Sequence, residues 1–93
     1  MDIKIENDVL EAVISSSGAE LISLKTRKDG TERIWQADPE IWKRHAPVLF
    51  PYTGKLREGH YFYNGEEYKG GQHGFARDVE HQPVEQSRNN VVF

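Results

Sequence analysis

The sequence contains no cysteine. Without a thiol the chain cannot build a disulfide framework, use a thiol nucleophile or bind zinc through cysteine. It also lacks an apolar run of the roughly 20 residues needed to span a bilayer, and its first residues carry no hydrophobic signal-peptide core. We therefore expect a cytoplasmic protein with no membrane partner.

An excess of positive charge is lacking as well. The chain has 12 basic and 15 acidic residues, a net charge of −3, and an isoelectric point near 5.8. Nucleic-acid-binding proteins usually present a concentrated basic surface, so no nucleic-acid partner is expected. With 93 residues the chain can form at most one domain, and its core must be thin. This composition is more typical of part of a larger fold than of a small autonomous domain.

Along most of the chain, apolar residues alternate with polar ones, which is typical of β-strands with one buried face. The turn signals Asn7-Asp8 and Asn64-Gly65 each separate two such runs and therefore predict β-hairpins. The first hairpin is expected over residues 2–14, and further strands over 19–26, 32–36, 79–86 and 91–93. The pattern predicts an all-β fold.

One short helix is expected within this β fold. Asp38 is a suitable N-cap, and Pro39 suits the first helical position. Pro47 disfavours a helical conformation in the residue before it, which limits the helix to residues 38–44.

The last residues, Val91 to Phe93, begin a β-branched and aromatic run that is shorter than an ordinary strand. A domain seldom stops as a strand begins. We therefore expect residues 1–93 to be the N-terminal portion of a single domain that is truncated at its C-terminus.

Residues 70–78 are the densest group of side chains suited to ligand binding. His73 lies between glycines and can donate to or accept from a hydroxyl, and Arg77 offers a fork of donors for hydroxyl or phosphate oxygens. Phe75 could stack on the apolar face of a sugar ring. The alternative is a surface turn in which Arg77 pairs with Asp78 and His73 caps a loop.

A second candidate is Lys55, which follows an apolar run and the glycine turn at Gly54. It is either a fixed cation that reaches into a polar cavity or an ordinary exposed lysine after a buried strand. Trp35 and Trp42 could stack on sugars, although buried packing is the more usual role of tryptophan.

The remaining histidines, His45, His60 and His81, show no metal-binding spacing, so no metal ligand is predicted, with a site assembled by the fold as the alternative. The sequence also has no nucleophile elbow, no P-loop and no dinucleotide-binding glycine motif. Acyl transfer and nucleotide binding therefore have no local support.

An ordered set of segments resembles the aldose 1-epimerase (galactose mutarotase) family, over essentially the whole chain. The matching segments are Gly18–Leu24, Ile34–Gln36, Trp42, Ala46–Lys55 and His73–Asp78. The resemblance implies part of a galactose-mutarotase-like antiparallel β-sandwich (supersandwich) with a sugar site in a cleft on one concave sheet. It also implies interconversion of the α and β anomers of an aldohexose by acid–base ring opening, with no metal or organic cofactor.

Individual residues take roles from the same resemblance. His73 matches the histidine of the family's His-Gly motif, which binds the sugar near its ring oxygen. Lys55 stands where relatives usually have an arginine that contacts sugar hydroxyls, so a point charge replaces a fork. Arg77 matches an arginine that is also found in relatives acting on hexose 6-phosphates. Phe75 completes the expected substrate-binding set.

The resemblance places the acid histidine and the base glutamate of the family beyond Phe93. No catalytic residue is therefore expected within residues 1–93, and these residues alone are expected to lack epimerase activity. The partner expected is an aldohexose. Three alternatives stay open: a non-catalytic carbohydrate-binding module, a relative of hexose-6-phosphate 1-epimerases, and a homo-oligomer formed through strand pairing.

Overall fold

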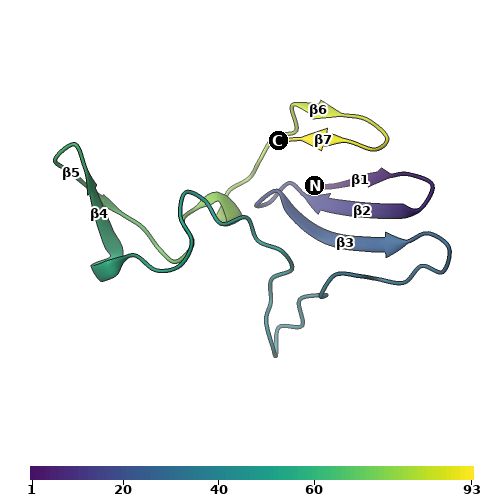
Figure 1. The fold of residues 1–93 in the computed structure, drawn as a ribbon, viewed down its shortest axis with the longest axis horizontal. Helices are drawn as coiled ribbons and strands as arrows, with labels where there is room; N and C mark the ends of the chain where they lie inside the picture. The colour runs from purple at the N-terminus through teal and green to yellow at the C-terminus, as the bar shows by residue number, and fades with distance from the viewer.

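Antiparallel β-strand pairs form nearly all the regular structure of this chain (Figure 1). The computed structural model describes all residues 1–93 and confirms the all-β fold. Its helical elements are two single 3-10 turns, and no helix is long and apolar enough to cross a membrane. The elements, in chain order, are β1 (Asp2–Glu6), β2 (Leu10–Ser15), β3 (Glu20–Thr26), η1 (Arg57–Gly59), β4 (His60–Tyr63), β5 (Glu66–Lys69), η2 (Ala76–Asp78), β6 (Glu85–Gln86) and β7 (Val91–Val92).

Strands β1, β2 and β3 form a three-stranded antiparallel sheet. The register pairs Ile5 with Ala12 and Ala12 with Leu24, so these apolar side chains share one face of the sheet. The Asn7 side chain accepts hydrogen bonds from the backbone N–H groups of Val9 and Leu10, each at 2.8 Å. The first predicted hairpin and its turn are thereby confirmed.

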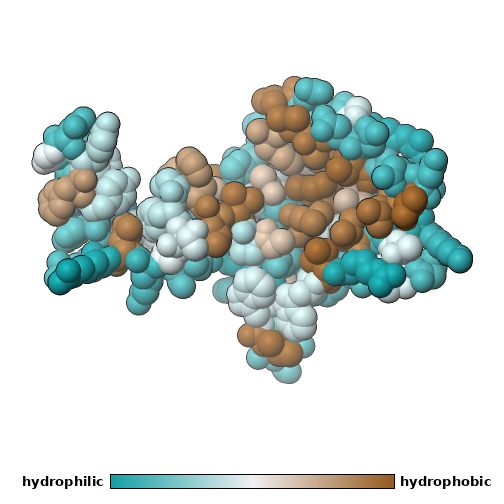
Figure 2. All heavy atoms as spheres, in the orientation of Figure 1, coloured by the Kyte–Doolittle hydropathy of each residue, from teal (hydrophilic) through white to brown (hydrophobic).

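The apolar face of this sheet lies open. Ile3 and Ala76 are the buried hydrophobic residues of the chain. Figure 2 shows hydrophobic side chains gathered over the region of the sheet. The radius of gyration is 16.3 Å, whereas a compact domain of this length would have about 12 Å. These residues do not enclose a core of their own, and association of copies through strand edges stays a prediction.

Two further hairpins lie outside this sheet. The β4–β5 hairpin projects away from the rest of the chain (Figure 1), and Tyr61 stacks on Tyr68 with ring centroids 5.2 Å apart. Its turn places Asn64 at φ 49° and Gly65 at φ 78°, as the predicted turn chemistry requires. The β6–β7 hairpin lies beside β1, because the N–H of Glu6 donates to the carbonyl of Arg88 at 2.7 Å.

The helix predicted over residues 38–44 is wrong, because the chain makes only one turn there. The Asp38 carbonyl accepts from the N–H of Ile41 and of Trp42, at 3.0 and 2.8 Å, and its side chain caps the turn. The indole of Trp35 then donates to the Trp42 carbonyl at 2.8 Å. So few residues do not offset the cost of helix nucleation, and this tertiary contact fixes a different path for the chain.

Two predicted strands are also shorter than expected. In residues 32–36 there is no strand, and a single bridge joins Glu32 to Lys25. The Glu32 carboxylate accepts hydrogen bonds from the N–H groups of Leu24 and Ile34, which are therefore not available for strand pairing. In residues 79–86 the strand is limited to β6, and Pro83, which has no N–H, lies just before it.

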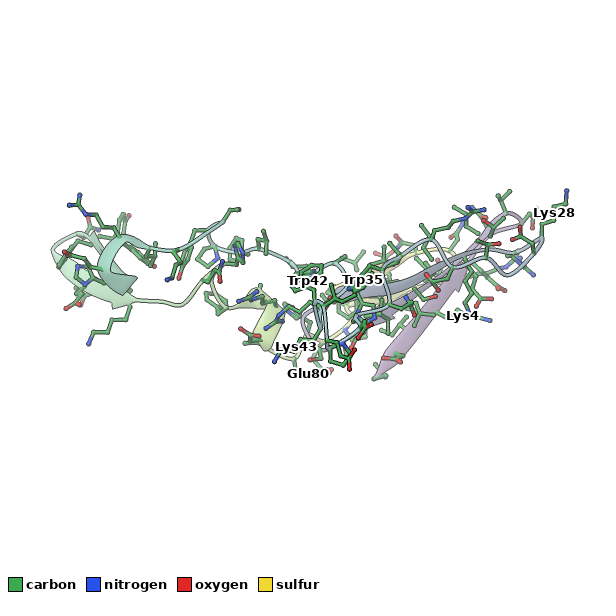
Figure 3. All side chains as sticks on the ribbon, turned by 90° about the horizontal axis from the view of Figure 1, so that it is seen from below. Lys4, Lys28, Trp35, Trp42, Lys43 and Glu80 are labelled. Atoms are coloured by element: carbon green, nitrogen blue, oxygen red, sulfur yellow. The ribbon has the colours of Figure 1, made fainter.

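Both tryptophans are more exposed than buried packing would require. Trp35 is 42% exposed and Trp42 is 50% exposed. They lie next to one another outside the sheet (Figure 3), joined by the indole hydrogen bond described above. The expectation of core packing is wrong within these 93 residues, because the loop that carries the two rings runs along the outside of the sheet.

We expect Glu32→Gln to destabilise the full protein more at pH 7 than at a pH low enough to protonate the Glu32 carboxyl. Hydrogen bonds from the Ser23 hydroxyl, and next from the Leu24 N–H, hold the pKa of the Glu32 carboxyl below its ordinary value of 4.5. With a lowered pKa, the stabilisation is present above the ordinary value and is lost as pH falls through the lowered one. Urea unfolding of both variants at the two pH values measures the difference.

Glu40→Gln is the matched control, since the Glu40 side chain is exposed and forms no ion pair. It should leave stability unchanged at both pH values. An equal loss of stability at the two pH values for Glu32→Gln would contradict the role assigned to its carboxylate.

Candidate functional site

Two loops, residues 42–49 and 72–77, form the walls of a groove. The groove has a volume of about 310 Å³ and is lined by Trp42, Pro47, Leu49, Gln72, His73 and Arg77. The structure therefore brings together two of the residues singled out from the sequence, His73 and Arg77. The other wall of the groove is largely aromatic and apolar.

Backbone hydrogen bonds to one carbonyl hold the two loops together. The carbonyl of Phe50 accepts from the N–H of Phe75 at 3.0 Å and from that of Ala76 at 3.3 Å. Gly74 lies against the same carbonyl at φ 74°, and a Cβ at this position would overlap the Phe50 backbone. Only glycine fits such a close approach, which explains one of the glycines beside His73.

His73 is held by Gly54 in both directions. Its N–H donates to the Gly54 carbonyl at 2.8 Å, and its Nδ1 accepts from the Gly54 N–H at 2.7 Å. Because Nδ1 is the acceptor, the neutral ring must carry its proton on Nε2. The loop-capping role and a ligand-binding role therefore use different nitrogens of one ring, and Nε2–H is the donor left for a ligand.

Arg77 offers donors that the chain itself does not use. Its Nη2 donates to the Gln72 carbonyl at 3.0 Å, while its Nε is buried with no hydrogen-bond partner. The expected surface pair with Asp78 is present at 3.8 Å, but Asp78 is bound more closely by Arg44, at 2.8 Å. The Arg77 Nε lies 3.8 Å from the Asp78 carboxylate and is too buried to meet a ligand, whereas Nη1 makes no hydrogen bond within the chain and is the donor left for a ligand oxygen.

Two arginines, Arg44 and Arg77, balance the negative charge of Asp78. The hydrogen bond from Arg44, reinforced by the positive charges of Arg44 and Arg77, lowers the pKa of the Asp78 carboxyl below its usual value. Asp78 therefore stays ionised at neutral pH and joins the two arginines at the end of the groove.

Lys55 and Phe75, the other two predicted binding residues, lie outside the groove. Lys55 is exposed and follows Gly54, so it is next to the His73 link without lining the cavity. Phe75 lines a neighbouring cavity of about 240 Å³ and packs edge-on against Phe50 with centroids 6.1 Å apart.

The sequence did not single out Pro47, Leu49 or Gln72 as parts of the site. Pro47 and Leu49 belong to an apolar run that was interpreted as a buried strand, whereas Leu49 is 38% exposed and the run makes one bridge only. Within these 93 residues the run is therefore not a buried strand, and its one bridge joins Phe50 to Gly74. For Gln72 the available signal was its place beside His73.

The chemistry of the groove suits a ligand with many oxygens and one apolar face. Trp42 and Leu49 present carbon surfaces, and His73 and Arg77 present N–H donors. No three histidine, aspartate or glutamate side chains converge to hold a metal ion in the structure. A hexose has both an apolar ring face and a set of hydroxyl acceptors.

Comparison with known proteins identifies the family. A sequence model described as aldose 1-epimerase matches residues 1–93. The chain is 40% identical over 98 residues to the plasmid form of protein LacX of Lactococcus lactis subsp. lactis, an alignment that covers 100% of this chain and 32% of that protein. The whole-chain match shows that the chain belongs to the aldose 1-epimerase family.

Two solved structures show the same fold. A galactose mutarotase related enzyme from Lactobacillus acidophilus superimposes with a TM-score of 0.94 at 46% identity, over 98% of this chain and 30% of that one. A galactose mutarotase-like protein from Lactobacillus casei gives 0.90 at 41% identity, over 95% of this chain and 30% of that one. The galactose-mutarotase-like fold is therefore confirmed, and the chain spans about a third of the length of these relatives.

We expect nitrogen NMR of the full protein to find His73 with its proton on Nε2. The Gly54 N–H can donate only to an unprotonated Nδ1. With the histidines labelled by ¹⁵N and the ring neutral, Nδ1 of His73 should give the signal of an unprotonated nitrogen. His60 is the internal control, because its Nδ1 lies 3.3 Å from the Glu67 carboxylate and should therefore carry a proton. A proton found on Nδ1 of His73 would contradict the geometry.

Proposed function

We propose that the protein carrying this chain is an aldose 1-epimerase that interconverts the α and β anomers of an aldohexose in the cytoplasm. In this proposal, residues 1–93 form the N-terminal portion of a single galactose-mutarotase-like domain. The observation that carries it is the groove in which His73 and Arg77 present N–H donors opposite Trp42. Family membership supports the reaction class.

The reaction requires two proton transfers and one reversible bond cleavage. A base takes the proton from the anomeric hydroxyl, an acid protonates the ring oxygen, and the bond between that oxygen and the anomeric carbon breaks to give the aldehyde. Rotation of the carbonyl group and reversal of the same steps give the other anomer. The two transfers are fastest when the acid and base are fixed around a sugar that is itself held still.

In this scheme, residues 1–93 bind and orient the sugar. His73 donates through Nε2–H to a sugar oxygen, and Arg77 donates to hydroxyls at the far end of the groove. Lys55 and Phe75 extend the contacts beyond the groove, as a cation and as an aromatic ring. The acid and the base come from residues outside 1–93, and no metal or organic cofactor takes part.

We expect the full protein to accelerate the mutarotation of fresh α-D-galactose or α-D-glucose in a polarimeter. His73→Asn should lower kcat/KM by about tenfold to a hundredfold, because it removes the Nε2–H donor. The asparagine oxygen can still accept from the Gly54 N–H, and asparagine tolerates the φ of 64° found at this position. The loop should therefore keep its shape.

His60→Asn is the matched control, since His60 lies on the projecting β4–β5 hairpin and lines no part of the groove. It should leave the rate unchanged. If calorimetry shows that the protein binds hexoses while polarimetry shows only the buffer rate, the protein is a carbohydrate-binding module and the epimerase proposal fails.

A second candidate substrate is a hexose 6-phosphate. The observation that favours it is the Arg77 guanidinium in the lining of the groove, with Nη1 free of hydrogen bonds within the chain, since guanidinium groups bind phosphate oxygens well. Under this candidate, the protein should prefer D-glucose 6-phosphate to D-glucose in polarimetry. Arg77→Lys, which keeps the charge and loses the fork, should reduce that preference by about tenfold. A protein that shows no preference acts on the free hexose.

A further inference from the structure

We propose that the segment Ser16–Glu20, which follows β2 and ends at the first residue of β3, holds both walls of the groove in place, and that Glu20 is its principal positioning residue. No side chain of this segment lines the groove. Any effect on a ligand must therefore pass through the loops that the segment binds. The choice of ligand in this proposal rests on the proposed function, whereas the contacts between segment and loops do not.

Glu20 fixes the first wall. Glu20 is only 9% exposed. Its Oε1 accepts hydrogen bonds from the backbone N–H groups of His45, at 2.7 Å, and Ala46, at 2.8 Å. These two amides lie between Trp42 and Pro47, which both line the groove. A buried carboxylate that accepts two charge-assisted hydrogen bonds is a strong anchor, and Glu20 is itself paired to β2 in the sheet.

Ser16 fixes the segment that follows the second wall. It is 1% exposed, its hydroxyl donates to the Glu80 carboxylate, and its carbonyl accepts from the N–H of His81 at 2.9 Å. The N-terminal ammonium group of Met1 donates to the same hydroxyl at 3.0 Å. The Ser16 side chain is thus fully engaged in holding chain segments far apart in sequence, which a buried hydroxyl requires.

Gly18 brings the same segment against Arg77. Its N–H donates to the Val79 carbonyl at 2.8 Å, and its φ is 75°. A Cβ at Gly18 would lie 2.6 Å from the Arg77 carbonyl oxygen, so only glycine allows this approach. The backbone that carries Arg77 into the groove is therefore packed directly on Gly18.

An ion pair closes the arrangement across the groove. Arg44, which precedes the amides bound by Glu20, donates to Asp78, which follows Arg77, at 2.8 Å. The walls are thus linked to each other by this pair and to the sheet by Ser16–Glu20. A substitution at Glu20 should therefore loosen the loop that carries Trp42 directly. Through the Arg44–Asp78 pair, it should also loosen the loop that carries Arg77.

The test combines two measurements on the full protein: amide hydrogen exchange, and hexose binding by calorimetry. Glu20→Ala should speed exchange at residues 45–46 by about tenfold, with a smaller increase over 72–78, and weaken hexose binding by about tenfold. Exchange in β1 and β2 should stay slow. Glu20→Gln keeps an oxygen able to accept from both amides and should stay within about threefold of the unaltered protein. Ser17→Ala, whose side chain is exposed in the same segment, should change neither measurement.

Unchanged exchange at residues 45–46 in Glu20→Ala would overturn the proposal, and so would loosened loops with unaltered hexose binding. If Glu20→Ala also speeds exchange in β1 and β2, Glu20→Asp decides instead. It keeps the charge but withdraws the carboxylate by one methylene, so exchange should rise at residues 45–46 while β1 and β2 stay slow, and no rise there would overturn the proposal. If the unaltered protein binds no hexose, the proposed function fails, while the exchange results still judge the positioning role.

Discussion

The pair of hydrogen bonds between Gly54 and His73 is the constraint on which the site depends. It joins two loops that are 19 residues apart and occupies one ring nitrogen of the histidine. The proton of the neutral ring is thereby placed on the other nitrogen. The positive φ of His73 belongs to the same turn, and it directs the following glycine onto the Phe50 carbonyl. Without this link, neither the tautomer of His73 nor the position of its ring would be defined.

Polar contacts hold the groove together more than an apolar core does. Few hydrophobic residues of the chain are buried, whereas Ser16 and Glu20 are buried and bind backbone groups of distant loops. The apolar face of β1–β3 is not covered by other parts of residues 1–93 (Figure 2). The relatives of this chain are about three times as long. The positions of His73 and Arg77 therefore follow from hydrogen bonds to fixed backbone groups, which specify direction as well as distance.

Local turn chemistry made the hairpins predictable from the sequence. Asn64-Gly65 adopts the positive φ values that its turn requires, and Asn7 caps the first hairpin through its own side chain. The helix over residues 38–44 was not predictable in the same way, because the contact between Trp35 and the Trp42 carbonyl depends on tertiary structure. Local signals also do not show which strand a short run will pair with.

For the candidate site, the hydrogen-bond donors could be predicted from the sequence, whereas the shape of the groove could not. The types and spacing of His73 and Arg77 marked them as ligand-binding candidates, and both line the groove. The opposite wall could not be predicted, since the path of the loop that carries Trp42 and Leu49 depends on contacts with distant residues, among them the hydrogen bonds to Glu20. For Lys55, the structure agrees with the alternative of an ordinary exposed lysine, since its side chain is exposed and lines no part of the groove.

The most direct test of the central claim is a crystal structure of the full protein with a bound aldohexose. The account predicts a sugar in the groove between residues 42–49 and 72–77, with one of its oxygens within hydrogen-bond distance of His73 Nε2 and another near Arg77. A sugar bound elsewhere, with His73 Nε2 making no contact to it, would contradict the account.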